Sequence, residues 1–388
     1  KEPIMKKSLL FGLLLLNAVH FCNISFGQEL PYTLTFRPGW NWTSFPTAGC
    51  DRNKPALVYD LFKGMDPWPP DLLFLQYSSP AGPIMFINYT MCGWEQAGSL
   101  TEIFADRGYK LLVYPMDGDT VKLDLTGTLP DEKTLVTLEK GNNWVSYFSI
   151  NPAYPEQCIP EDVLRHIFQI KTQYWSMTRI TNKDTSWFIK GRITPLRFGD
   201  LVILNSDRRS SFCWTEPNEQ VEIHSLTQPV HFQVEETDQY LPVYFSLDAG
   251  SDIREIAVMA DTEMKGAVVR EPGDTIVEVR AYFDHLSAGK RISFKTWKGK
   301  EDRILSSEDY VVIDHFRSIS DNRNLFTGEG SIFYHISLKS NDVNGLPAAI
   351  GKVNCRNSPE SATFSFRINN NGNISLCVYD LQGNIVKT

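Results

Sequence analysis

The chain has 388 residues and a net charge of −8, with 42% hydrophobic, 22% charged and 12% aromatic residues. Roughly 100–200 residues per domain predicts two to four domains, and this composition excludes wholesale disorder. An acidic surface without a long Lys or Arg run repels phosphate backbones, so no nucleic-acid partner is expected. Because aromatic residues suit strands while 25 Gly and 22 Pro supply turns, we predict a mainly β fold with some α+β.

The N-terminal segment, residues 1–27, has the pattern of a secretory signal peptide. Lys6 and Lys7 precede an apolar run at 9–16, and small residues end the segment. The run is shorter than the about 20 residues that span a bilayer. We therefore expect an exported protein, at the cell surface or extracellular, with residues 1–4 as an upstream extension and no transmembrane segment in the mature chain.

A short motif occurs twice after the signal segment. Residues 39–45 and 141–147 share the order Gly–x–Asn–Trp–x–Ser–aromatic, 102 residues apart. Each copy closes with an apolar stretch after a glycine, and Gly108 is matched with Gly199. Repetition of this kind indicates tandem modules. The predicted modules are residues 28–128 and 129–224.

Each module is predicted to be a small α+β unit, because a helical pattern follows its first strand. Helices are expected at residues 57–63 and 160–169. In the second helix, Pro160 suits the first helical position, and the apolar residues fall on one face. That face consists of Val163, Leu164, Ile167 and Phe168.

Tryptophans of the two copies are candidate ligand-contacting aromatics, through stacking on a carbohydrate. The candidates are Trp40, Trp94 and Trp187. The alternative, which two copies favour, is that tryptophans fill the core of each small module. No catalytic, cofactor-binding or metal-binding residue is assigned.

Six cysteines follow the signal segment, and an even number in an exported protein permits disulfides. Two pairs would each lie within one module, and they would join Cys50 to Cys92 and Cys158 to Cys213. Buried free thiols are the alternative. No cysteine spacing fits a zinc or redox site.

The two copies resemble a repeat of secreted multidomain proteins from Bacteroidetes-like bacteria, whose motif runs roughly L–x–x–GWNW–(I/V)–(S/G)–(F/Y). The resemblance covers about 180 residues and is most specific at residues 39–45 and 141–147. It implies a secreted or cell-surface protein, and it carries over no catalytic role.

Residues 225–339 alternate short apolar segments with turns, which predicts a β-sandwich domain. Within them, residues 256–267 resemble a hairpin of surface-protein sandwich domains from the same bacteria. The expected strands are residues 231–235, 240–247, 255–259, 266–269, 275–283, 292–297, 310–314 and 332–337.

A turn-rich linker is predicted at residues 340–349, before a C-terminal segment at 350–388. This segment resembles the C-terminal sorting domain of the type IX secretion system, which is related to immunoglobulin-like sandwiches. Roughly half of such a domain would remain beyond Thr388, so a partial sandwich is expected. The matching residues are Leu376, Val378, Tyr379, Gly383 and Val386.

Two hypotheses follow for the function. The first is a non-catalytic exported surface or secreted protein for adhesion, glycan contact or cell-surface assembly, with the secretion machinery as a partner and a glycan or protein ligand. The common hydrolase, zinc-protease and nucleotide-binding motifs do not occur in the sequence. The alternative is the accessory region of a secreted hydrolase whose catalytic domain is absent or unrecognised.

Overall fold

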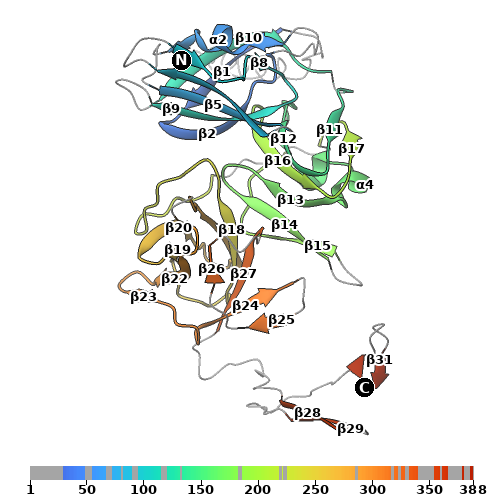
Figure 1. The fold of residues 1–388 in the computed structure, drawn as a ribbon, viewed down its shortest axis with the longest axis vertical. Helices are drawn as coiled ribbons and strands as arrows, with labels where there is room; N and C mark the ends of the chain where they lie inside the picture. Colours follow the sequence, from blue (N-terminus) through green and yellow to red (C-terminus); the bar gives the residue numbers. More distant parts are fainter. Residues whose placement is uncertain are drawn as a thin grey trace, which may run out of the picture. The chain divides into compact units, whose positions relative to one another are not determined.

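The computed structural model divides the chain into two units, residues 1–337 and 338–388 (Figure 1). Several predicted features lie outside the described residues, namely the signal segment at 1–27, Cys50, Cys92, Trp94 and the linker at 340–349. The structure describes residues 29–48, 55–66, 72–79, 82–89, 95–114, 120–131, 133–181, 186–217, 221, 225–284, 287–315, 319–321, 325–327, 332–339, 354–358, 361–365, 378–379 and 385–387.

The fold is mainly β, as predicted, and its first part is built on a five-stranded antiparallel sheet. The sheet has the order β2 (Gly39–Ser44), β9 (Gly108–Tyr114), β5 (Leu72–Ser79), β6 (Gly82–Tyr89), β7 (Glu95–Ala97). Helix α2 (Val58–Phe62) confirms the helix predicted at 57–63. The remaining strands form a sheet of β1 (Glu29–Phe36), β10 (Val121–Thr128) and β4 (Met65–Asp66), and a pair of β3 (Ala56–Leu57) and β8 (Glu102–Ile103).

The next part has a five-stranded sheet with the same arrangement of strands. Its order is β12 (Gly141–Ser146), β16 (Leu201–Ser206), β13 (Ile167–Lys171), β14 (Ser176–Thr181), β15 (Ser186–Lys190). In both sheets, the strand that carries the motif pairs with the last strand of the sheet, and the other three follow in chain order. Strands β11 (Val136–Leu138) and β17 (Ser210–Phe212) form a separate pair.

The helix predicted at residues 160–169 is wrong beyond its first turn. Helix α4 covers only Glu161–Leu164, and a short helix, α3 (Pro155–Cys158), precedes it. From Ile167 onwards the chain is strand β13, paired on both sides with β14 and β16. The spacing of these apolar residues therefore fits the periodicity of a strand as well as that of a helix. The exposed Phe168 lies where the register of β13 against β16 shifts.

The Gly–x–Asn part of the motif begins each of the two strands and fixes the turn that leads into it. Gly39 and Gly141 have φ values of +93° and +102°, which disfavour any residue with a Cβ. The Asn41 side chain donates to the carbonyl oxygens of Arg37, at 2.8 Å, and Gly39, at 3.0 Å. Asn143 makes the same bonds one copy later, to Glu139 and Gly141. The motif is thus explained by turn geometry.

The two sheets meet at their motif strands in a twofold-like arrangement. The amide of Ser44 donates to Gly199 O at 2.7 Å, and the amide of Ser146 donates to Asp106 O at 3.1 Å. Ser44 pairs with Gly108 and Ser146 pairs with Leu201 in the two sheets. The strand register thus aligns Gly108 with Leu201. The sequence match of Gly108 with Gly199 was therefore wrong by two positions.

Residues 225–339 form two five-stranded sheets. Their facing side chains Phe245, Phe294 and Tyr310 contact one another, with ring centroids 5.1 and 5.0 Å apart. The first sheet is β21 (Ile276–Ala281), β18 (Leu241–Ser246), β27 (Tyr334–Leu338), β24 (Tyr310–Asp314), β25 (Ile319–Asp321); the second is β20 (Glu263–Val269), β19 (Glu255–Ala260), β22 (Arg291–Trp297), β23 (Asp302–Ile304), with β26 (Leu325–Phe326) beside β22.

One strand predicted in this region, at residues 231–235, does not form. The carboxylate of Glu255 instead accepts the backbone N–H groups of Val230, His231 and Phe232, at 3.1, 3.1 and 2.9 Å. A side chain therefore satisfies the donors that a strand ladder would use. The other seven predicted strands overlap observed strands.

The second unit contains two short antiparallel hairpins among its described residues. They pair β28 (Asn354–Ser358) with β29 (Ser361–Ser365) and β30 (Val378–Tyr379) with β31 (Ile385–Lys387). The sorting domain remains a prediction. Across the described part of the whole chain, no helix has the length and apolar character needed to cross a membrane.

Candidate functional site

The tryptophan that follows the motif asparagine, Trp42 in one copy and Trp144 in the other, packs where the two sheets meet. Trp42 is buried and stacks on Tyr240, with centroids 5.7 Å apart. The ammonium group of Lys110 lies 4.3 Å from the Trp42 ring and 4.7 Å from the ring of Trp144. These contacts favour the core role for the motif tryptophans.

The segment before β18 is fixed against this junction by two lysines. Lys110 donates to the carbonyl oxygen of Asp238, and Lys171 donates to Tyr240 O at 2.5 Å. Burial lowers the pKa of Lys110 to about 8 and that of Lys171 to about 7. Backbone carbonyls are thus the main polar partners of two desolvated ammonium groups.

The two candidate aromatics that the structure describes, Trp40 and Trp187, do not form one platform. Trp40 is half-buried and makes an edge contact with Phe74, at 5.7 Å between centroids. Trp187 lies on β15 with 45% of its surface exposed, edge-on to His315 at 6.4 Å. Trp40 and Trp187 therefore belong to different sheets.

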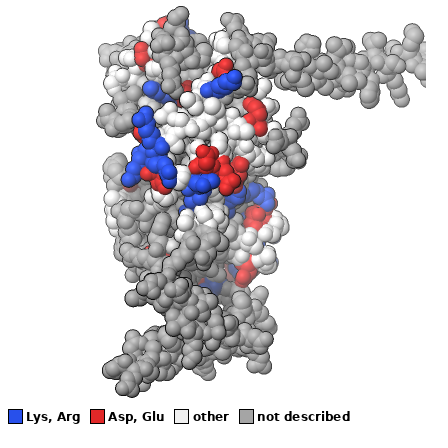
Figure 2. All heavy atoms as spheres, turned by 90° about the vertical axis from the view of Figure 1, so that its right-hand side faces the viewer, with Lys and Arg blue, Asp and Glu red and all other residues white. Residues whose placement is uncertain are grey.

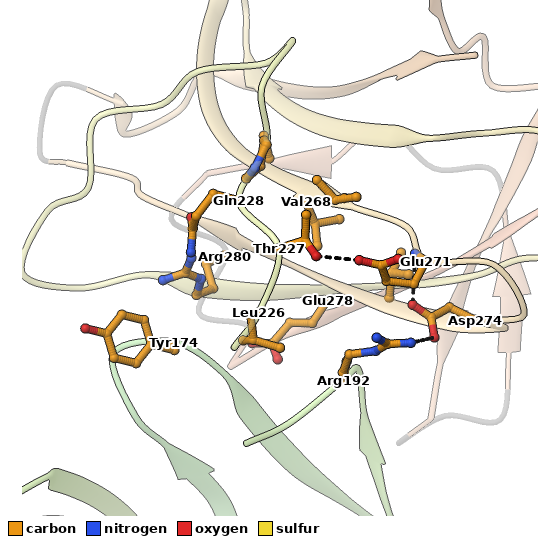
Figure 3. Close-up of a pocket in the computed structure, with 14 residues that line it drawn as sticks. Tyr174, Arg192, Leu226, Thr227, Gln228, Val268, Glu271, Asp274, Glu278 and Arg280 are labelled. Atoms are coloured by element: carbon orange, nitrogen blue, oxygen red, sulfur yellow. Dashed lines mark hydrogen bonds and ion pairs between the residues drawn. The ribbon is translucent and has the colours of Figure 1, made fainter. Parts of the chain in front are cut away.

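A groove lies beside the Trp42 junction, and Tyr174 stands within it. Its larger part has a volume of about 310 Å³ and is lined by Arg37, Trp42, Arg197 and Asp200, among others. A smaller part of about 50 Å³ continues towards β20 and β21. Both parts share Tyr174, Leu226 and Gln228, and we call them together the Tyr174 groove. Figure 3 shows the residues of the smaller part.

One wall of the groove is a tight turn from Arg197 to Asp200. The amide of Asp200 donates to Arg197 O at 2.9 Å, and Gly199 has a φ of +88° at the third position, as a type II turn requires. The Asp200 carboxylate accepts the amide of Arg197 at 2.8 Å. Desolvation still raises the pKa of Asp200 to about 7.

The small part of the groove is closed by Glu278 from β21. Its carboxylate accepts the amide of Ser176 at 2.8 Å and the Ser176 hydroxyl at 2.6 Å. Burial raises the pKa of Glu278 to about 7. Nearby, Arg280 donates to Gln173 O at 2.7 Å. At the other end, Arg192 pairs with Asp274 at 3.2 Å (Figure 3).

Two arginines of the larger part differ from these paired groups. Arg37 and Arg197 are both exposed, and within the described residues neither guanidinium makes an ion pair or hydrogen bond. Tyr174 is 42% exposed, and the positive charge of Arg37 acts to lower its pKa against the raising effect of burial. An aromatic face and two available cations therefore line the same groove.

The twofold-like arrangement produces a second groove, of about 510 Å³, which we call the Trp144 groove. Two of its charged side chains, Arg107 and Glu139, have partners within the chain, whereas Lys140 makes no ion pair or hydrogen bond among the described residues. The Arg107 guanidinium lies 4.0 Å from the Phe104 ring, and Glu139 pairs with Arg209 at 3.2 Å. The two grooves thus have equivalent positions and different chemistry.

Three side chains linked by hydrogen bonds lie beside Trp187. Ser246 Oγ is 2.7 Å from His335 Nε2, and His335 Nδ1 is 2.7 Å from His315 Nε2. The two imidazole rings are within 10° of parallel. Burial lowers the pKa of His335 to about 4, so its ring is neutral at pH 7. Sequence reasoning missed this cluster because its members lie on separate strands.

The disulfide predicted between Cys158 and Cys213 does not form, since both are free thiols. Cys158 points into the core. Cys213 lies between Phe212 and Trp214, whose rings are both buried and in contact at 4.9 Å. Because alternate residues of an extended chain face opposite ways, Cys213 points away from that core.

Among the described residues, no group of three or more His, Cys, Asp or Glu could hold a metal ion. On the face shown in Figure 2, basic groups adjoin acidic ones, and no continuous basic field covers its described part.

No protein-family model, curated protein or solved structure matches this chain.

Proposed function

We propose that the chain is an exported surface or secreted protein that binds a glycan in the Tyr174 groove. The observation that carries this proposal is the exposed Tyr174 ring beside Arg37 and Arg197, whose guanidinium groups have no partner in the described chain. A sugar ring offers C–H groups to an aromatic face and hydroxyls to arginine donors. The groove itself is proposed to bind without catalysis.

The volume of the groove suits this role. About 310 Å³ lies at the lower end of the range for small-ligand sites. Its surroundings are fixed by buried contacts, including Gln173, which donates to Trp40 O and accepts from the Trp42 amide, at 2.8 and 2.9 Å. A groove held by such contacts loses little conformational entropy on binding.

The wider architecture is part of the proposal. The two five-stranded sheets are proposed to be copies of one module, which their common strand order and Gly–x–Asn turns support. Residues 225–339 are proposed to be a β-sandwich, and residues 350–388 part of a type IX sorting domain. Export and surface attachment rest on the signal segment and on that C-terminal resemblance.

Glycan-array binding of the full chain tests the glycan proposal. We expect Tyr174→Ala to abolish binding of the glycans that the native chain retains. Tyr59→Ala is the matched control, because Tyr59 is similarly exposed, at 47%, on α2. Absence of glycan binding by the native chain, or equal loss in both variants, would contradict the proposal.

A second candidate function, a hydrolase, is favoured by one observation: the Ser246, His335 and His315 chain matches the order nucleophile, base and orienting group. In this function, the Ser246 oxygen would attack an ester carbonyl while His335 takes its proton and returns it to the leaving alcohol; water would then release the acid. A fluorophosphonate probe tests it. Labelling of Ser246 that is lost in His315→Gln supports the hydrolase, and an unlabelled Ser246 excludes it.

A further inference from the structure

The Tyr174 groove and the Trp144 groove allow a comparison of equivalent positions within one molecule. The side chain of Asn41 accepts a hydrogen bond from the N–H of Arg37 and donates one to its C=O. Asn143 makes the same two bonds to Glu139. Arg37 and Glu139 therefore occupy the same place in the two copies. A cation in one groove replaces an anion in the other.

The turn that forms the opposite wall also differs in charge between the two grooves. The turn from Arg197 to Asp200 closes with an amide-to-carbonyl bond of 2.9 Å, and Phe104 to Arg107 closes with the same bond at 3.2 Å. Asp200 and Arg107 also form equivalent bridges to the motif strands. Arg197 thus occupies the place of an uncharged Phe104.

The positive charge of Arg37 and Arg197 in the Tyr174 groove contrasts with the net negative charge of the chain. The chain as a whole carries a net −8. Arg37 and Arg197 are nevertheless left without a carboxylate partner in the described chain, whereas Arg192 and Arg280 are paired with Asp274 and Glu236, at 3.2 and 3.3 Å.

Asp200, the acidic residue that lines the larger part of the groove with these arginines, offsets their charge only in part. Its carboxylate already accepts the Arg197 amide. Burial raises its pKa to about 7, so a large fraction of it is uncharged near neutral pH.

We infer that the Tyr174 groove selects acidic saccharides, with a sugar carboxylate held by Arg37 and Arg197 and the sugar ring against Tyr174. Guanidinium groups bind carboxylates through charge-assisted, often bidentate hydrogen bonds. This inference rests on the proposed glycan-binding function and adds the class of ligand.

Titration calorimetry of the full chain with a panel of uronic-acid oligosaccharides, each paired with its neutral methyl ester, tests the inference. We expect the acidic form to bind at least ten times more tightly than its ester. Arg37→Ala/Arg197→Ala should remove that difference, because it weakens the binding of the acidic form far more than the binding of the ester. Arg165→Ala, an exposed arginine of the same module, is the control and should change neither affinity.

The outcomes separate the inference from the function on which it rests. Equal affinity for acid and ester, with both lost in Tyr174→Ala, would overturn the acidic selectivity and keep glycan binding. No binding of any acidic oligosaccharide, while an array still reports Tyr174-dependent neutral glycans, would do the same. If neither class binds, both proposals fail.

Discussion

The hydroxyl of Ser146 donates to the hydroxyl oxygen of Ser44 at 2.8 Å, in a buried position between the two motif strands. The two serines occupy the same place in the two copies of the motif. Ser44 Oγ in turn lies 3.3 Å from Asp200 O, as a donor. The motif serine is therefore a junction residue, which joins one copy to the other and reaches the wall of the Tyr174 groove.

Replacing Ser44 should cost more than replacing Ser146. Ser44→Ala leaves the buried Ser146 hydroxyl without its acceptor, a loss of about 1–3 kcal/mol. Ser146→Ala leaves the bond from Ser44 to Asp200 intact. Urea unfolding of both variants and of the double variant should give a coupling energy of about 0.5 kcal/mol or more. Additive effects would show that the bond contributes nothing, and the exposed Ser211→Ala is the control.

Gly108 is predicted to tolerate no side chain. A Cβ at this position would lie 2.2 Å from Leu201 Cδ1 and 2.8 Å from Val145 O. Gly108→Ala should therefore lower the free energy of unfolding by about 1–3 kcal/mol. Gly108→Ala/Leu201→Ala should cost less than the sum of the two single changes, because one of the two clashes disappears. Gly250→Ala, which meets nothing within 4 Å, should be nearly neutral; a similar loss there would refute the steric account.

Glu278 should make stability depend on pH. Its pKa is raised by burial to about 7, so folding favours the protonated acid, and this contribution is lost as pH rises towards 7. Glu278→Gln removes the ionisation. The variant should therefore be less stable than the native chain at pH 5 and closer to it, or more stable, at pH 8. Chemical denaturation at both pH values measures this change, and an identical difference at each would contradict it.

Cys158 and Cys213 should differ in reactivity. Cys158 is fully buried and burial raises the pKa of its thiol, whereas Cys213 is half-buried. Iodoacetamide should modify Cys213 in the folded chain and Cys158 only on unfolding. Peptide mapping without reductant should find no link between them. A Cys158–Cys213 disulfide in the purified protein would contradict the structure.

Much of the fold could be predicted from short patterns. The short apolar run in 310–314 predicted β24 at its observed bounds, Tyr310–Asp314. The helix at 160–169 failed because Ile167 and its neighbours fit both periods, and pairing with two strands decided between them. The missing strand at 231–235 depends on Glu255, a distant carboxylate that no local pattern reports.

The candidate site was less predictable for the same reason. Trp187 was predicted from the sequence as a candidate ligand-contacting aromatic, and it is exposed. Its contact with His315 could not be predicted, because His315 is far away in sequence. Arg37 belongs to the turn before the motif, and its role depends on Arg197 and Tyr174, which other segments bring to the groove. Spacing along the chain carries no information on such encounters.

Hydrogen–deuterium exchange of the full chain, with and without a bound acidic oligosaccharide, tests whether the Tyr174 groove is the binding site. We expect protection to be confined to peptides that cover Arg37, Thr172–Trp175 and Arg197–Leu201, which line the Tyr174 groove. Protection of the Trp144 groove instead, around Phe104–Arg107, or of neither groove, would contradict the assignment of the site.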